Sequence, residues 1–245
     1  MVKVENISKR YGDHYAVKNL SFEIEKGSYT AIVGFNGSGK STIAKILCGL
    51  EESASGQVSF DRDVQMGIVF QSPKDQIVSS IVNRDTAFGP QNLHLAKSEI
   101  ELRTIECLSV VDILDKSLTS TSALSLGQTQ KVALAGMLAT WPKVLILDES
   151  VAMLDPDSRK SVFEFLSQWH KHGKTIIHIT HDLDAVKQTN RTIAIESGKL
   201  FFDGTTKDFL SVQKNALRIE GKKLPECNRQ KTNCGNRKYK ILCTW

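Results

Sequence analysis

The sequence predicts an α/β fold built on a parallel β-sheet with helices on both faces. Residues 29–33 form a fully apolar run, which is followed by a glycine-rich loop and an apolar-periodic segment from about residue 40 to residue 50. Two further apolar runs, 144–147 and 175–180, have the length and composition of central parallel strands. The segment 157–172 between them has helical spacing, and strands that alternate with helices are typical of a parallel sheet covered on both faces.

Three other regions complete the predicted organisation. Residues 2–7 and 17–24 alternate between apolar and polar side chains and predict N-terminal antiparallel β-strands. The segment from about 72 to 139 contains long helical patterns and no convincing strand, so we expect a helical lobe inserted into the sheet domain. Residues 213–245 lose the apolar period, and we expect a basic tail that is disordered or loosely docked outside a domain of residues 1–212.

Composition and charge narrow the class of protein. No apolar stretch approaches the ~20 residues of a membrane-spanning helix, and the N-terminus lacks the apolar region of a signal peptide. Of the 32 Lys/Arg and 27 Asp/Glu, the residues outside 218–245 hold 24 and 25, so this part of the chain is nearly neutral. Nucleic-acid-binding surfaces are normally basic, which argues against a nucleic-acid partner. We expect a cytoplasmic protein that reaches a membrane only through a partner.

The loop after the first apolar run carries a phosphate-binding motif. Residues 34–41 match G-x-x-x-x-G-K-[ST], and they follow a buried strand and open a helix, as the mechanism requires. Backbone N–H groups and the helix N-terminus would surround the phosphates of ATP. Lys40 would reach the β- and γ-phosphates, and the Ser41 hydroxyl would ligate Mg²⁺. The predicted nucleotide-binding residues of this loop are Gly34, Asn36, Gly37, Ser38, Gly39, Lys40, Ser41 and Thr42.

A second apolar strand ends in two carboxylates. Asp148 and Glu149 follow the run 144–147, and α/β sheets bind ligands at the carboxyl ends of their strands. Asp148 would hold Mg²⁺, and Glu149 would act as the general base that polarises the attacking water.

Residues 124–128, Leu-Ser-Leu-Gly-Gln, resemble the L-S-G-G-Q signature of ABC-type ATPases and end 20 residues before Asp148. The resemblance implies a P-loop NTPase (RecA-like) core with the signature on an inserted α-helical subdomain. It also implies that Ser125, Gly127 and Gln128 contact the ATP of a second ATPase subunit, of the same or a similar chain, in a head-to-tail dimer. Leu126 stands where the family usually has glycine, at a position that varies within the family.

Other positions follow the same resemblance in order along the chain. Gln71 is similar to the Q-loop glutamine that contacts metal and water, and His181 is similar to the switch histidine that contacts the γ-phosphate. Leu154-Asp155 resembles the D-loop, with Ala152 in place of the usual serine. Tyr11 lies 23 residues before Gly34, which is the family's usual spacing for the aromatic residue that stacks on adenine. The other histidines match no such position: His14, His94, His170, His172 and His178.

Among ABC proteins, a transporter ATPase fits the chain best. About 50 residues between Gln71 and the signature cannot hold the coiled coil of a chromosome-type ATPase, and the chain has room for one nucleotide domain where translation-type proteins carry two. A non-enzymatic scaffold would lack Lys40 or Glu149, and both are present.

The stretches 70–76, 86–92, 135–139 and 153–156 resemble the energy-coupling factor type of importer, which takes up vitamins or transition-metal ions. The alternative is a binding-protein-dependent importer. Both imply ATP and Mg²⁺, integral membrane partner subunits, and a location at the cytoplasmic face of the membrane.

Overall fold

The structure is a computed structural model, and it describes residues 1–61 and 64–212. The predicted basic tail, 213–245, lies outside the described residues. The strands are β1 (Val2–Tyr11), β2 (His14–Ile24), β3 (Tyr29–Val33), β4 (Ser55–Phe60), β5 (Met66–Val69), β6 (Val144–Asp148), β7 (Thr175–Ile179), β8 (Arg191–Glu196) and β9 (Lys199–Thr205). The α-helices are α1 (Lys40–Leu47), α2 (Val82–Asn92), α3 (Lys97–Val110), α4 (Leu126–Ala139), α5 (Pro156–Lys171) and α6 (Leu183–Lys187).

The central sheet has the strand order β5-β6-β7-β3-β8-β9. Its first five strands are parallel, and β9 pairs antiparallel with β8. Every residue of β3, β6 and β7 is buried, because helices cover both faces of the sheet. The α/β fold class predicted from the three continuous apolar runs is therefore confirmed.

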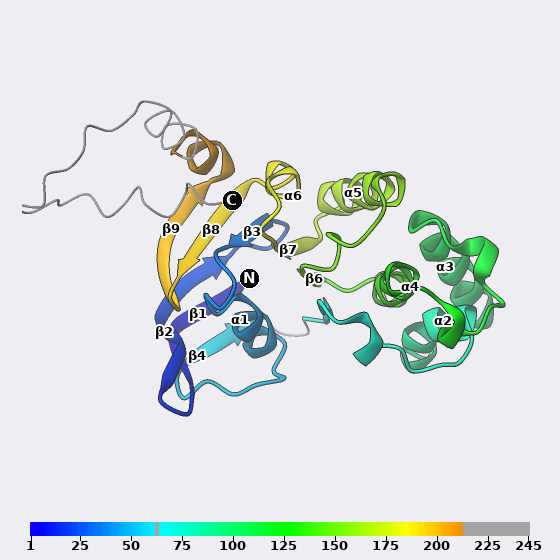
Figure 1. Cartoon of the computed structure of the whole chain (residues 1–245), viewed down its shortest axis with the longest axis horizontal. Helices are drawn as coiled ribbons and strands as arrows, with labels where there is room; N and C mark the ends of the chain where they lie inside the picture. Colours follow the sequence, from blue (N-terminus) through cyan, green and yellow to red (C-terminus); the bar gives the residue numbers. More distant parts are fainter. Residues whose placement is uncertain (62–63, 213–245) are drawn as a thin grey trace, which may run out of the picture.

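A second, antiparallel sheet in the order β2-β1-β4 lies beside the central one (Figure 1). The sequence predicts β1 and β2 but not β4, which pairs with β1. The side chains of β4 are exposed at every position except Val58, which is half-buried. An edge strand of this kind has no apolar run to reveal it.

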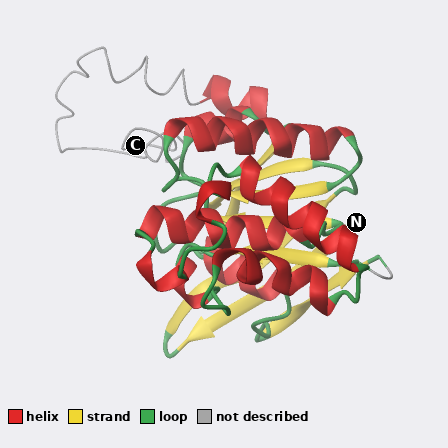
Figure 2. Ribbon diagram, turned by 90° about the vertical axis from the view of Figure 1, so that its right-hand side faces the viewer, coloured by secondary structure: helices red, strands yellow, loops and turns green. Residues whose placement is uncertain are grey.

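The segment 72–139 folds as three α-helices, α2, α3 and α4, with three short 3₁₀ turns at Pro73–Asp75, Leu114–Lys116 and Thr121–Ala123. The three helices gather at one end of the molecule, away from the antiparallel sheet (Figure 1), and they lie in front of the strands when that end faces the viewer (Figure 2).

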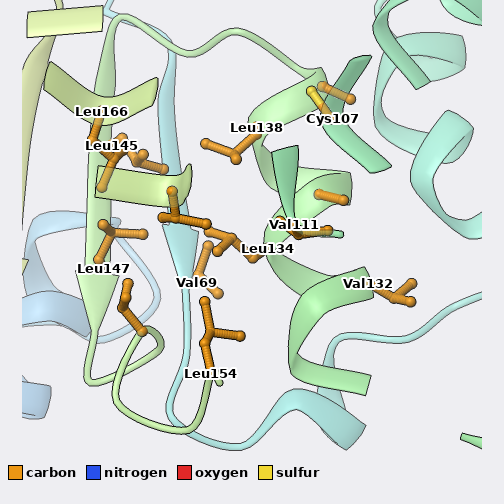
Figure 3. Packing of buried hydrophobic residues seen from close by; sticks show 14 of the residues in the cluster. Val69, Cys107, Val111, Val132, Leu134, Leu138, Leu145, Leu147, Leu154 and Leu166 are labelled. Carbon is orange, nitrogen blue, oxygen red and sulfur yellow. The ribbon is translucent and has the colours of Figure 1, made fainter. Parts of the chain in front are cut away.

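Helix α4 joins this lobe to the central sheet. Leu134 and Leu138 project from α4 toward Leu145 and Leu147 of β6, with Val69 of β5 between them (Figure 3). All five side chains are essentially inaccessible to solvent. Fully burying a leucine or valine stabilises by about 1.5–3 kcal/mol, so this shared apolar cluster holds the lobe on the core. Within residues 1–61 and 64–212, the chain forms no helix of the length and hydropathy that crossing a membrane requires.

Candidate functional site

Four neighbouring parallel strands end at one edge of the central sheet. In spatial order these are β5, β6, β7 and β3, and each is followed by a residue or loop with a predicted role. Gln71 follows β5, Glu149 follows β6, His181 follows β7 and the loop 34–39 follows β3. The carboxyl ends of adjacent parallel strands meet at the same edge, so segments far apart in the sequence converge there.

A cavity of about 620 Å³ opens at this edge of the sheet. It is lined by Tyr11, His14, Ala16, Asn36, Gly37, Gly39, Lys40, Ser41, Thr42, Gln71, Glu149 and His181. Sequence reasoning assigns no role to His14, which shares no motif with the others, yet its side chain lies in this wall. A larger cavity of about 730 Å³ between α5 and α6 contains none of the predicted catalytic or nucleotide-binding residues.

Two glycines of the phosphate loop are required by the geometry. Gly39 precedes α1 with a φ of 100°, and a Cβ there would lie 2.2 Å from the carbonyl oxygen of Ala16. A Cβ on Gly34 would lie 2.3 Å from the carbonyl oxygen of Ile195. Any larger residue at either position would push the loop away from the strands that support it.

Lys40 lies at the base of this loop and is only 5% exposed. Its ammonium donates hydrogen bonds to the carbonyl oxygens of Gly34 (2.7 Å) and Phe35 (3.0 Å), and it lies 4.0 Å from Oε1 of Glu149. Burial lowers the pKa of Lys40, and attraction to Glu149 and Asp148 offsets part of that shift. A buried ammonium surrounded by oxygen acceptors is suited to pairing with an anionic ligand.

Glu149 has a backbone conformation that non-glycine residues rarely adopt. Its φ is 53°, and its N–H donates to the carbonyl oxygen of Ile179 in the neighbouring strand (2.9 Å). Its Oε2 lies 2.9 Å from Nδ1 of His181. Backbone strain of this kind costs on the order of 1–3 kcal/mol and concentrates at functional sites, where it aims a side chain.

Asp148 is the last residue of β6, is 3% exposed, and is not among the residues that line the cavity. Burial raises the pKa of its carboxyl, and a hydrogen bond from Ser41 partly opposes that change. Its Oδ1 is buried and has no hydrogen-bond partner. An unsatisfied carboxylate oxygen beside a hydroxyl fits a hard cation such as Mg²⁺, which binds few protein ligands and completes its shell with phosphate and water. The described residues hold no group of three or more His, Cys, Asp or Glu side chains that could bind a metal.

Tyr11 lies at the end of β1 with 47% of its surface exposed. Its hydroxyl donates to the carboxylate of Glu51, which also lies 3.4 Å from Lys9 Nζ and 3.3 Å from Lys45 Nζ. The Tyr11 hydroxyl also hydrogen-bonds Thr42, in the first turn of α1. Sequence reasoning missed Glu51, because it belongs to no motif and meets Tyr11 only through the fold.

The signature residues lie elsewhere in the molecule. Ser125 is the N-cap of α4 and forms a capping box with Gln128, in which Gln128 N donates to Ser125 Oγ (3.3 Å) and Ser125 N donates to Gln128 Oε1 (3.0 Å). Leu126, which stands where the family usually has glycine, is 48% exposed, so the fold of this chain has room for its side chain. None of Ser125, Gly127 and Gln128 lines the cavity of the phosphate loop.

An ion pair ties the signature helix to the residues that resemble the D-loop. Lys131, in the second turn of α4, places Nζ 2.8 Å from Oδ2 of Asp155 and donates to the carbonyl oxygen of Asp112 (3.1 Å). Asp155 also caps α5 by accepting from the N–H of Ser158 (3.0 Å). The hydrogen bond from Lys131 holds the pKa of the Asp155 carboxyl well below its usual range.

Comparisons with known proteins agree with this geometry. Residues 17–152 match the family described as ABC transporter. The energy-coupling factor transporter ATP-binding protein EcfA1 of Staphylococcus aureus (strain N315) is 38% identical over 233 residues, which covers 89% of this chain and 87% of that protein. The EcfA1 protein of the bovine strain RF122 / ET3-1 is 39% identical over 219 residues, or 84% of this chain and 81% of that protein.

Solved structures give the same result. CbiO1 from Clostridium perfringens, described as part of the ABC transporter complex cbiONQ, superposes with a TM-score of 0.74 at 33% identity and covers 91% of this chain and 95% of its own. The dimeric ATP-binding cassette MJ0796 bound to ADP and Pi superposes with a TM-score of 0.76 at 26% identity and covers 84% of this chain and 99% of its own. The chain therefore belongs to the ABC transporter family, as an ATP-hydrolysing cassette of the energy-coupling factor type.

Proposed function

We propose that this cassette is the motor subunit of an importer for a vitamin or a transition-metal ion, and that it works at the cytoplasmic face of a membrane. The observation that supports the ATPase role is the cavity in which Lys40, Glu149 and His181 meet at one edge of the sheet. The import role draws on the similarity to EcfA1, which is named for an energy-coupling factor transporter, and to CbiO1, which is part of a transporter complex.

Within the cavity, Lys40 binds the β- and γ-phosphates of ATP, because its buried ammonium is held by the carbonyl oxygens of Gly34 and Phe35 at the start of the phosphate loop. Ser41, Gln71 and Asp148 would hold Mg²⁺, and Oδ1 of Asp148 is buried without a hydrogen-bond partner. When bound, Mg²⁺ would neutralise negative charge on the phosphate oxygens.

Glu149 accepts a proton from the attacking water as the general base. His181 orients Glu149 across the 2.9 Å contact and offers its ring to the γ-phosphate. The residues of the adenine side are Tyr11, which stacks on the base, and Thr42, which supports it from α1.

The signature acts on a second subunit. Ser125, Gly127 and Gln128 are absent from the walls of their own chain's cavity, and Ser125 is exposed at a helix N-terminus where an anion is favoured. A head-to-tail dimer of residues 1–212, with the helical subdomain at 72–139 facing the partner, completes two ATP sites between two subunits.

The test of this function is the substitution Glu149→Gln in the purified chain. The amide cannot accept the proton of the attacking water, so ATP turnover should fall at least ~100-fold while ATP still binds. The variant should also accumulate as an ATP-bound dimer, measured by light scattering. Glu164→Gln, which removes an exposed carboxylate from α5, is the matched control and should hydrolyse ATP normally. Near-normal turnover of Glu149→Gln would remove the residue from the role of base.

A further inference from the structure

An ion pair connects helix α5 to the loop that carries His181. Arg159, one turn into α5, pairs with Oδ2 of Asp182, the residue directly after His181. The side chains of Arg159 and Asp182 are only 26% and 23% exposed. A pair with this degree of burial is not interchangeable with a surface pair, because removal of one partner leaves the other charge poorly solvated.

The guanidinium of Arg159 is held by more than the carboxylate. It lies over the ring of Phe163, one helical turn further along α5, at 5.5 Å from the ring centroid. Stacking of this kind fixes the plane of the guanidinium and limits its rotamers. The side chain of Arg159 is therefore held in one orientation by two contacts, the carboxylate of Asp182 and the ring of Phe163.

Asp182 is fixed on its other sides as well. Its Oδ1 accepts from the N–H of Asp184 (2.9 Å) and caps α6, and its own N–H donates to Oγ1 of Thr180 (3.0 Å). The backbone on both sides of His181 is thus tied at Thr180 and at Asp182. The pair with Arg159 links this loop to helix α5, whose N-cap is Asp155.

We propose that Arg159 is a positioning residue for hydrolysis, which acts by holding the switch histidine in register with Glu149. Arg159 holds the loop of His181 through its ion pair with Asp182. The same helix begins next to its N-cap Asp155, which pairs with Lys131 of the signature helix. These two ion pairs connect the loop of His181, the D-loop residues and helix α4, so these three segments should move together. This inference rests on the proposed role of His181.

The experiment uses the full-length chain in its purified transporter complex, with kcat and KM for ATP measured for Arg159→Met and Arg159→Lys. Misplacement of a group by about 1 Å can cost ~100-fold, so we expect Arg159→Met to lower kcat on the order of tenfold or more. KM for ATP should change by less than about twofold, because Arg159 does not line the cavity at the phosphate loop. Arg159→Lys should recover part of the loss, since it keeps the charge that pairs with Asp182 but not the planar guanidinium that lies over Phe163.

Lys160→Met is the matched control, because it removes a cation from the next position of the same helix, where the side chain is exposed. It should leave kcat unchanged. If Arg159→Met fails to fold, Asp182→Asn, which keeps the shape of the side chain, carries the same test and should show the same loss of kcat.

A double-substitution comparison separates positioning from general stability. In a His181→Ala background, Arg159→Met should cost nothing further in kcat, because the residue through which it acts is already absent. A further tenfold loss there would overturn the inference and leave Arg159 a structural residue. If His181→Ala itself hydrolyses ATP normally, the proposed role of His181 fails, and Arg159 loses its role with it. If only His181→Ala is impaired and Arg159→Met is normal, the inference alone is wrong.

Discussion

The phosphate-loop region and the signature region of this chain differ in how much of an ATP site each contains. The phosphate-loop region has a cavity, a buried ammonium at Lys40 and a carboxylate oxygen of Asp148 without a hydrogen-bond partner. Ser125 and Leu126 of the signature are exposed, and the side chains of Ser125 and Gln128 hydrogen-bond each other's backbone. The first region has polar groups that are available to a ligand, whereas the polar side chains of Ser125 and Gln128 already form hydrogen bonds within their own helix.

This difference shows where the free energy of ATP binding is concentrated. The buried ammonium of Lys40 gains most from a bound anion, because it is desolvated before the anion arrives. The signature gains only after a second subunit has brought a phosphate to its helix N-terminus. One subunit should therefore bind ATP alone, and two subunits are needed to hydrolyse it quickly.

The substitution Lys40→Ala breaks the stronger half of the comparison and should have the largest effect. Truncating one partner of a buried charge pair costs about 2–5 kcal/mol, so ATP affinity should fall by roughly 30-fold to several thousandfold. The increase in melting temperature that saturating ATP gives the wild-type chain should then nearly vanish. The measurement is thermal unfolding with and without ATP, and Lys199→Ala, on the exposed strand β9, is the control. An unchanged ATP-induced shift would place the nucleotide site elsewhere.

The substitution Ser125→Arg tests the weaker half. An arginine at the N-cap removes the hydroxyl that faces the partner's ATP and sterically obstructs closure of the interface, so turnover should fall on the order of 100-fold, as loss of a transition-state donor does. Nucleotide binding by the isolated subunit should be unaffected, because Ser125 lies outside its own cavity. Ser122→Arg, three residues earlier and also exposed, is the control.

Mixing two inactive variants sharpens this test. A dimer of one Ser125→Arg subunit and one Lys40→Ala subunit keeps one site with both Lys40 and Ser125 intact, although neither homodimer has such a site. If two copies of this chain pair, an equal mixture should recover roughly a quarter of wild-type turnover, because half of the dimers are mixed and each has one good site. Loss of nucleotide binding by the isolated Ser125→Arg subunit would contradict a site shared between subunits.

The sequence predicts where the phosphate-loop motif lies in the fold, between a strand and a helix, because its signals are local. The loop 34–41 combines a buried strand, glycines and a helix start within a short stretch, and Asp148 and Glu149 end an apolar strand in the same way. The parallel order of the strands then places them together. The structure adds the strained backbone of Glu149, which no pattern of residue types reveals.

The residues that support these motifs could not be predicted in this way. Glu51 lies 40 positions from Tyr11 in the sequence, and Lys131 lies 24 positions before Asp155. Arg159 reaches Asp182 only because α5 and the loop after β7 are neighbours in the folded chain. A charged residue on a predicted helix is usually interpreted as solvent-exposed. Its partner in an ion pair is set by the packing of elements that are distant in the sequence, which no local pattern reveals.

The substitution Tyr11→Ala should have the smallest effect, and it divides the nucleotide site into its base and phosphate halves. Stacking of a base on an aromatic ring is worth ~1–3 kcal/mol, so ATP affinity should fall by about tenfold. Binding of tripolyphosphate, which has no base, should be unchanged, because Lys40 and the loop glycines are intact. Titration calorimetry with both ligands measures the two halves separately.

Two further variants test whether the ring or the hydroxyl of Tyr11 matters. Tyr11→Phe keeps the ring but removes the hydrogen bond to Glu51, and it should weaken ATP binding less than about threefold. Tyr15→Ala, at an equally exposed aromatic residue of β2 outside the cavity walls, is the control. If Tyr11→Ala weakened ATP and tripolyphosphate alike, Tyr11 would act by supporting α1 through Thr42, and the adenine would stack elsewhere.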